Sequence, residues 1–88
     1  MGSKFQTNTI KKLKKQGWKV LKIIRLNESG YPDLLALKQG QAIFIECKEK
    51  NDTLKPLQLF RMNELSEIGF LAFLEQDGKR SELDDFLK

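Results

Sequence analysis

The sequence predicts an α/β or α+β fold in which helices flank a mixed β-sheet. Segments with helical spacing of apolar residues alternate with short segments rich in β-branched and aromatic residues. Glycines stand where the predicted helices and turns end. The length of 88 residues suits one small domain, residues 1–88, and the chain shows no internal repeat or linker. The opening Met-Gly-Ser resembles a cloning remnant and carries no weight here.

The predicted order is helix, three strands, helix, strand, helix. The first helix, Phe5 to Gln16, has an apolar side and ends at Gly17. Trp18 to Arg25 is rich in β-formers and predicts the first strand. Two more strands, Pro32 to Lys38 and Ala42 to Lys48, are joined by a tight turn at Gly40.

The second half of the chain continues with a helix, a strand and a short helix. Pro56 suits the first turn of a helix that runs to about Ile68. Its predicted apolar arc contains Leu57, Met62, Leu65 and Ile68, with Gln58 and Arg61 also inside it. Phe70 to Glu75 predicts a strand, and Ser81 to Leu87 predicts a helix in which Ser81 and Asp84 resemble a capping box.

The register of the two central strands decides whether two acids meet. With Gln39-Gly40 as a two-residue loop, Asp33 lies opposite Glu46 and Leu35 opposite Phe44. A regular three-residue loop would place the two carboxylates on opposite faces of the sheet, unless a bulge corrected it.

Composition excludes several classes of site. The chain has one cysteine and no histidine, so an internal disulfide, histidine-dependent catalysis and His- or Cys-cluster zinc sites are excluded. The net charge of +4 favours a polyanionic partner, nucleic acid first and an anionic membrane second. No apolar run is long enough to span a bilayer and no secretory signal is visible, so a cytoplasmic protein of a bacterial or phage-infected cell is expected.

Asp33, Glu46 and Lys48 are the candidate catalytic cluster. Two like charges on neighbouring strands repel each other unless a cation lies between them. Mg²⁺ or Mn²⁺ prefers such oxygen ligands, and the backbone carbonyl of Cys47 is a plausible third. With Lys48 beside them, these groups fit hydrolysis of a phosphodiester. The alternative interpretation is ordinary: a strand-start aspartate and a solvated Glu-Lys pair.

These residues resemble a known family. Gly30-Tyr31-Pro32-Asp33, Phe44-Ile45-Glu46-Cys47-Lys48 and Pro56-Leu57-Gln58 are similar to the motifs of the PD-(D/E)xK nuclease superfamily, in particular the stand-alone VRR-NUC (virus-type replication-repair nuclease) domains of phages and prophages. The resemblance runs from Phe5-Gln6 through Gln16-Gly17-Trp18 to Gly69-Phe70.

The resemblance implies a restriction-endonuclease-like core in which Asp33 and Glu46 are metal ligands, Lys48 is catalytic and Gln58 points into the site. One feature departs from the family pattern, because the first predicted helix contains no acid where the family has a glutamate, and Gln6 lies near that place. This departure puts a second metal in doubt.

DNA, duplex or branched, is the expected partner. Candidate phosphate contacts are Lys50 and Lys55 in the loop beside the carboxylates, together with Lys22 and Arg61, although Arg61 has the alternative of snorkelling. The lysines of the first helix read equally well as a solvated face. No base-reading motif or aromatic ladder is evident, so recognition of DNA shape or branching is expected.

The leading hypothesis is a metal-dependent, structure-selective DNA endonuclease that acts on four-way junctions or other branched DNA. The resemblance implies a homodimer, and Leu59 and Phe60, which lie outside the helix arc, are the candidate interface. The alternatives are a DNA-binding module that keeps the fold without cleavage, and a small structural domain with ordinary surface charges.

Overall fold

The computed structural model describes residues 3–88, so Met1 and Gly2 of the opening tripeptide lie outside the described residues. Helices and strands follow the predicted order. Their bounds are α1 Lys4–Lys15, β1 Lys19–Lys22, β2 Leu34–Lys38, β3 Gln41–Lys48, α2 Pro56–Glu67, β4 Leu71–Gln76 and α3 Glu82–Leu87. Ser3 caps α1, because its side chain accepts a hydrogen bond from the backbone N–H of Gln6. Ser81 caps α3 in the same way, because its side chain accepts from the backbone N–H of Asp84, whereas the Asp84 side chain pairs with Lys12 and does not complete the predicted capping box.

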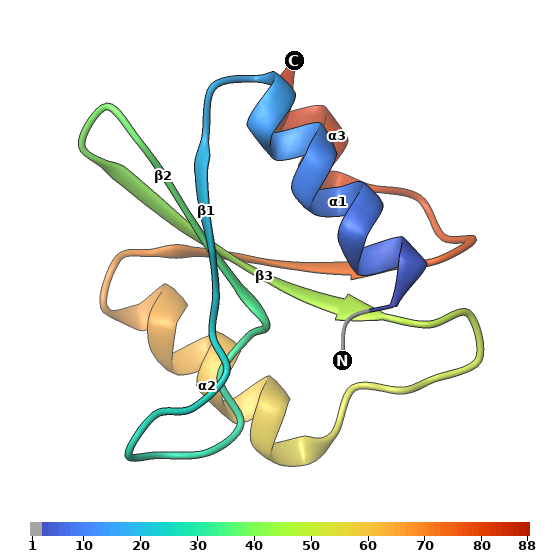
Figure 1. Cartoon of the computed structure of the whole chain (residues 1–88). Coiled ribbons are helices and arrows are strands. Elements are labelled where there is room, and N and C mark those ends of the chain that lie inside the picture. Colours follow the sequence, from blue (N-terminus) through green and yellow to red (C-terminus); the bar gives the residue numbers. More distant parts are fainter. Residues whose placement is uncertain (1–2) are drawn as a thin grey trace.

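The four strands form one mixed sheet in the order β1-β2-β3-β4 (Figure 1). β1 and β3 are both antiparallel to β2, whereas β3 and β4 are parallel and are connected through α2. The predicted register of the central hairpin is confirmed, since Leu35 lies opposite Phe44. Gln39 and Gly40 both have positive φ, 49° and 77°, as the two central residues of a tight hairpin turn require.

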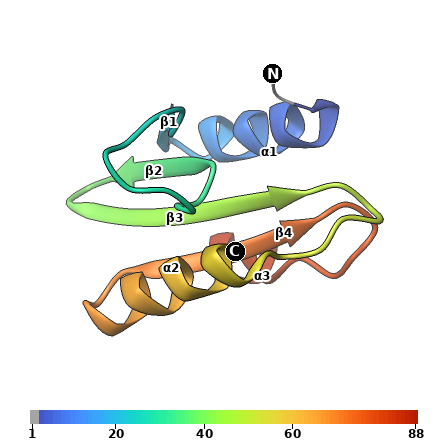
Figure 2. The same ribbon diagram turned by 90° about the horizontal axis from the view of Figure 1, so that it is seen from below.

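Helices cover both faces of the sheet. α1 and α3 lie side by side on one face and α2 lies on the other, as Figures 1 and 2 show. The main hydrophobic core fills the space under α1 and α3. Its buried members are Leu13, Trp18, Leu34, Ala36, Ile43, Ile45 and Leu83. Phe86 of α3 closes this core by packing against Trp18 and Phe73.

Three predicted details are wrong. The second strand begins at Leu34 and not at Pro32, so Asp33 lies just before it. The first strand ends at Lys22 and not at Arg25, because the chain leaves β2 after the hydrogen bond from Ile23 N–H to the Asp33 carbonyl. The predicted apolar arc of α2 is also not buried as a whole. Leu65 is buried, but Leu57 and Ile68 at the two ends of the helix are 45% and 65% exposed. Leu57 instead lies against the backbone of Gly30, and Ile68 caps the carboxyl end of the helix.

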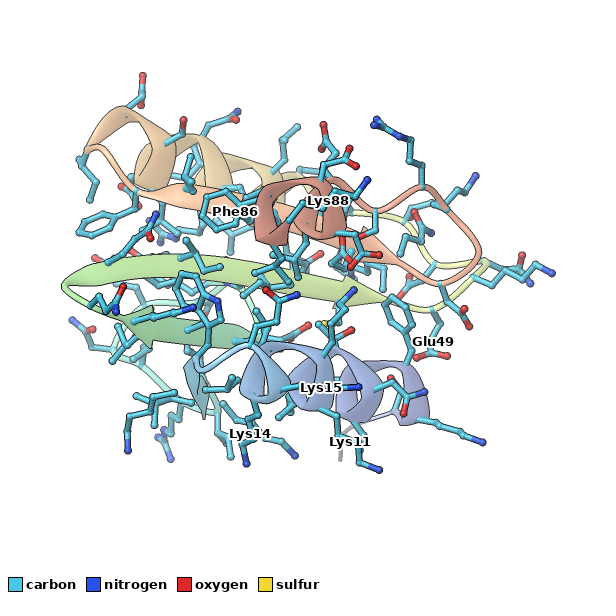
Figure 3. The ribbon with its side chains drawn as sticks, turned by 90° about the horizontal axis from the view of Figure 1, so that it is seen from above. Lys11, Lys14, Lys15, Glu49, Phe86 and Lys88 are labelled. Atoms are coloured by element: carbon cyan, nitrogen blue, oxygen red, sulfur yellow. The ribbon has the colours of Figure 1, made fainter. Side chains whose placement is uncertain are left out.

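The lysines of α1 lie on its outer side. In Figure 3, Lys11 and Lys14 point away from α3 and from the sheet, and Lys11, Lys14 and Lys15 are all exposed. This agrees with a solvated helix face. Across residues 3–88, no helix is long and apolar enough to cross a membrane.

Gly30 explains part of the Gly-Tyr-Pro-Asp motif. Its φ is +89°, and a Cβ added there would lie 2.6 Å from Leu57 Cγ and 3.2 Å from the Leu57 carbonyl oxygen. The glycine therefore lets the segment before Asp33 approach the first turn of α2.

We expect Gly30→Ala to destabilise the fold more than Gly40→Ala does. Both positions have positive φ, but the space around Gly40 is open, with nothing within 4 Å of an added Cβ. The matched pair therefore separates backbone strain from the clash with Leu57. The difference should be about 1 kcal/mol or more in the free energy of unfolding, measured by urea denaturation. Equal losses would show that Leu57 moves aside freely.

Candidate active site

Asp33, Glu46 and Lys48 come together at the end of the central hairpin. Leu34 pairs with Ile45, so continuing the register by one residue sets Asp33 beside Glu46. The Asp33 carboxylate accepts a hydrogen bond of 2.9 Å from the backbone N–H of Cys47, the residue after Glu46. Lys48 lies two residues after Glu46 on β3, with 3.7 Å between its Nζ and Glu46 Oε2. Local strand geometry thus gathers the three charged groups that the sequence indicated.

Glu46 is in an unfavourable place for a carboxylate. It is 2% exposed, and its Oε1 has no hydrogen-bond partner in the described part of the chain. Burial, followed by the negative charge of Asp33, raises the pKa of Glu46 to about 7, and Lys48 offsets only part of this. Lys48 by itself therefore does not hold Glu46 firmly in its charged form near neutral pH.

A hard divalent cation suits these groups. The side chains of Asp33 and Glu46, with the Cys47 carbonyl, offer oxygen donors of the kind that Mg²⁺ and Mn²⁺ prefer. The buried, unpartnered Glu46 Oε1 is an observation that fits such an ion. The chain offers few side-chain ligands for such an ion. Among residues 3–88, no group of three or more His, Cys, Asp or Glu side chains could hold a metal. Water or phosphate oxygens would have to complete the coordination.

Cys47 and Thr9 lie behind the site, toward α1. Burial, and then the charge of Asp33, raises the pKa of the Cys47 thiol to about 12, so its sulfur stays protonated. The predicted metal contact through the backbone carbonyl of Cys47 stays a prediction. Thr9 is the buried α1 residue at this end, and it contacts the Cys47 side chain. α1 brings no carboxylate to the site, because it contains no acid in its first turn or later.

Gln58 is tied to its own helix. Its Oε1 accepts a hydrogen bond of 2.9 Å from the backbone N–H of Lys55 and so helps to cap α2. The inward role predicted for Gln58 thus rests on the amide nitrogen alone and stays a prediction.

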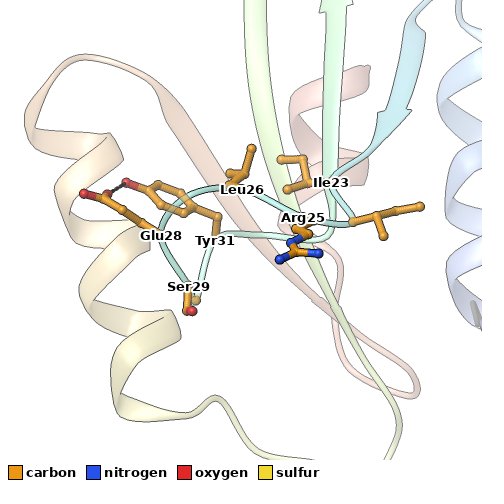
Figure 4. A pocket seen from close by; sticks show the side chains of 8 residues that line it. Ile23, Arg25, Leu26, Glu28, Ser29 and Tyr31 are labelled. Carbon is orange, nitrogen blue, oxygen red and sulfur yellow. Dashed lines mark hydrogen bonds between the residues drawn. The ribbon is translucent and has the colours of Figure 1, made fainter.

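Arg61 holds the loop that precedes Asp33. Its Nε donates to the Ser29 carbonyl at 2.8 Å, its Nη1 lies 3.3 Å from Glu64, and the guanidinium stacks on Tyr31. Tyr31 also donates to Glu28, and Figure 4 shows this pair in the hollow lined by residues 23–26 and 28–31. These contacts and its 15% exposure go against the predicted role of Arg61 in phosphate contact. The Arg61 guanidinium is already bonded to groups of this chain, the Ser29 carbonyl and the Glu64 carboxylate.

The loop after β3 carries one residue that the sequence reasoning missed. Asp52 lies close to Lys48, with 3.7 Å between its Oδ2 and Lys48 Nζ. Nothing in the local sequence marks it apart from other loop acids. Lys50 and Lys55 of the same loop are exposed, and so is Lys22 on β1, as contacts to DNA phosphates require.

Comparison with known proteins gives the family and the fold of this chain. The sequence model of the family described as archaeal Holliday junction resolvase (Hjc) matches residues 1–79. A similar solved structure is that of Hjc from Archaeoglobus fulgidus, a Holliday junction resolvase from an archaeal hyperthermophile. The TM-score is 0.64 and the sequence identity 19%, over 89% of this chain and 71% of that chain. The restriction-endonuclease-like fold expected from the sequence is thereby supported. Among curated proteins no match was found.

The raised pKa of Glu46 predicts that the chain without divalent metal loses stability as pH rises. The folded state binds this proton more tightly than the unfolded state, whose pKa is near 4.5. The stabilisation is therefore complete below pH 4.5 and is lost as pH rises through about 7. The loss should reach at most about 3 kcal/mol.

Urea unfolding from pH 5 to 8 in EDTA measures this effect. Glu46→Gln should remove most of the parent's fall in unfolding free energy, because the amide does not titrate. An identical pH profile for the two proteins would mean that Glu46 is not held in this strained state.

Proposed function

Because the chain belongs to the archaeal Holliday junction resolvase family, we propose that it is a divalent-metal-dependent DNA endonuclease that cuts four-way junctions. The observation that carries the proposal is the convergence of Asp33, Glu46 and Lys48 at one end of the β2–β3 hairpin. The proposed ion is Mg²⁺ or Mn²⁺, held by Asp33, Glu46 and the Cys47 carbonyl. When bound, such an ion lowers the pKa of a coordinated water and offsets charge on the phosphate.

The side chains have separate proposed roles. Asp33 and Glu46 supply negative oxygens that orient the cation against the scissile phosphate. Lys48, only 6% exposed, presents its ammonium group at the same place, where it donates to a phosphate oxygen or orients the attacking water. Gln58 is proposed to assist through its side-chain amide nitrogen, since its Oε1 is bonded to Lys55 N–H. Hydrolysis by these groups needs neither histidine nor a cysteine thiolate.

DNA contacts are proposed for the exposed lysines near the site. Lys50 and Lys55 lie in the loop that leaves β3 directly after Lys48, and Lys22 lies on the edge strand β1. Lysine contacts to phosphates position a duplex without reading its sequence. Such contacts fit binding that does not read base sequence, and the proposed substrate is branched DNA in a cytoplasmic setting. The narrower assignment to the VRR-NUC type of phages and prophages remains a prediction.

A second candidate function is a DNA-binding module with the nuclease fold and little cleavage. It is favoured by one observation: α1 has no acid, so the site has only two carboxylates to hold a metal. The two functions differ in whether junction DNA is cut when Mg²⁺ or Mn²⁺ is supplied.

Glu46→Gln tests the proposed activity. The amide keeps the size of the side chain but loses the charge that holds the cation, so junction cleavage should fall by more than about a hundredfold. Lys48→Ala should also abolish cleavage while metal binding persists. Junction binding in EDTA should survive in both variants, because neither change touches the exposed lysines. Cleavage of a labelled four-way junction with Mn²⁺, and a gel shift in EDTA, measure the two properties.

Glu75→Gln is the matched control, because Glu75 is equally buried but lies on the opposite face of the sheet. Its Oε1 accepts from Lys12 and Ser81, and an amide oxygen can still do so. This variant should cut junctions at close to the parent rate. A Glu46→Gln protein that cuts as well as the parent would show that the site is wrongly assigned.

We also propose a homodimer formed through α2, so that two sites act on a junction. Leu59 and Phe60 are 50% and 56% exposed, as the sequence predicted, and Leu57 and Ile68 add exposed apolar surface on the same helix. Leu59→Glu with Phe60→Glu should convert the dimer into a monomer, because charges would be desolvated in the interface. Sedimentation equilibrium at micromolar concentration measures the mass. A parent protein that is monomeric there would refute the dimer.

A further inference from the structure

We propose that Gln76 is a positioning residue for Lys48, and that it acts through the loop 49–52 and Asp52. This inference rests on the proposed function, because it concerns the lysine assigned to catalysis there. Gln76 is the last residue of β4 and pairs with Lys48 in the parallel β3–β4 ladder. It therefore lies on the same face of the sheet as Lys48, at the point where β3 leaves the sheet.

The side-chain amide of Gln76 lies within hydrogen-bonding distance of three carbonyl oxygens of this loop. Its Nε2 lies 3.2 Å from the Glu49 oxygen, 3.4 Å from the Lys50 oxygen and 2.6 Å from the Asp52 oxygen. The Asp52 N–H donates back to the Glu49 carbonyl at 3.1 Å, so the segment is a closed turn around one amide group. A side chain without N–H groups cannot satisfy these oxygens.

The turn fixes the direction of the Asp52 carboxylate. Its Oδ1 accepts from the Thr53 N–H at 2.8 Å, which leaves Oδ2 facing Lys48 at 3.7 Å. Because Gln76 binds the Asp52 carbonyl, the position of this carboxylate depends on Gln76.

Asp52 and Glu46 both attract the ammonium group of Lys48. Lys48 Nζ lies 3.7 Å from an oxygen of each acid, too far for a hydrogen bond to either. An unopposed ammonium–carboxylate pair closes to about 2.8 Å. With Asp52 in place, Lys48 stays between the two acids, and Glu46 keeps its oxygens available. If the loop moves, Lys48 closes onto Glu46 and leaves the position where it meets phosphate.

Gln76→Leu removes the N–H donors at similar volume, and Gln76→Glu, which keeps the shape without the donors, serves if the leucine variant does not fold. Amide hydrogen exchange should become faster across residues 49–53, and trypsin should cut faster after Lys50. Both readouts are independent of activity. Gln41→Leu, an exposed glutamine at the far end of β3, is the matched control and should change neither.

Single-turnover cleavage separates positioning from binding. In Gln76→Leu the rate at saturating junction should fall about tenfold, equal to about 1.4 kcal/mol. The junction Kd in Ca²⁺ should change less than about threefold, since the exposed lysines remain. Asp52→Asn should lower the rate in the same way. The double variant should be no slower than the slower single variant, because both changes act on one contact.

Three results would overturn the inference. Unchanged exchange in Gln76→Leu would show that the amide does not hold the loop. Faster exchange with an unchanged cleavage rate would make Gln76 a purely structural residue, and additive losses in the double variant would mean that Gln76 acts by another route than Asp52. A parent protein that cuts no junction would instead refute the proposed function. Hydrogen exchange would then test only whether Gln76 holds the loop 49–52.

Discussion

The antiparallel register of β2 and β3 is the constraint on which the site depends. Side chains alternate between the two faces of a strand, so a slip of one residue would turn Asp33 away from Glu46. The same slip would move Leu34 and Ala36 out of the core beneath α1 and α3, where both are fully buried. The core thus enforces the register, and the register brings the acids together. A turn of only two residues, Gln39 and Gly40, leaves little room for another pairing.

The cost of this arrangement is electrostatic. Two carboxylates are brought together at the end of an apolar hairpin, and the more buried one, Glu46, has an oxygen without a partner among the described residues. A protein selected only for stability would pair or solvate such groups. Local conflict of this kind is expected at sites that bind a charged ligand, because the ligand supplies the missing interaction. Glu75 also has a buried oxygen without a partner among the described residues, so what sets Glu46 apart is the second carboxylate, Asp33, beside it, and this supports the proposed metal site.

Sequence reasoning succeeded where one local rule determines the structure. It failed where contacts between distant parts of the chain determine a strand end or the position of a side chain. The order of elements, the hairpin register and the Ser81 cap follow from periodicity, loop length and capping, and the structure has them as predicted. The predicted end of the first strand was wrong, because pairing with β2 stops at Lys22 although the next residues still favour β-structure. A helical wheel shows the inward direction of Arg61 but not the loop carbonyl of Ser29 to which it donates, so its role in phosphate contact stays a prediction. Asp52 was missed because no local pattern indicates that the loop after β3 brings its carboxylate close to Lys48, and its carbonyl is bound by Gln76, more than twenty residues further along the chain.

α2 links the site to the remaining surface of the molecule. Leu65 is its one buried residue among those described, so the helix adds little to the core, and most of its apolar side chains face outward. Yet its first turn meets Gly30, and Arg61 binds the loop before Asp33. A helix that has few buried residues, but that contacts the segment before Asp33, is sensitive to whatever covers its outer face. Burial of that face by a second chain would therefore also fix the segment that carries Asp33, which connects assembly to the geometry of the active site.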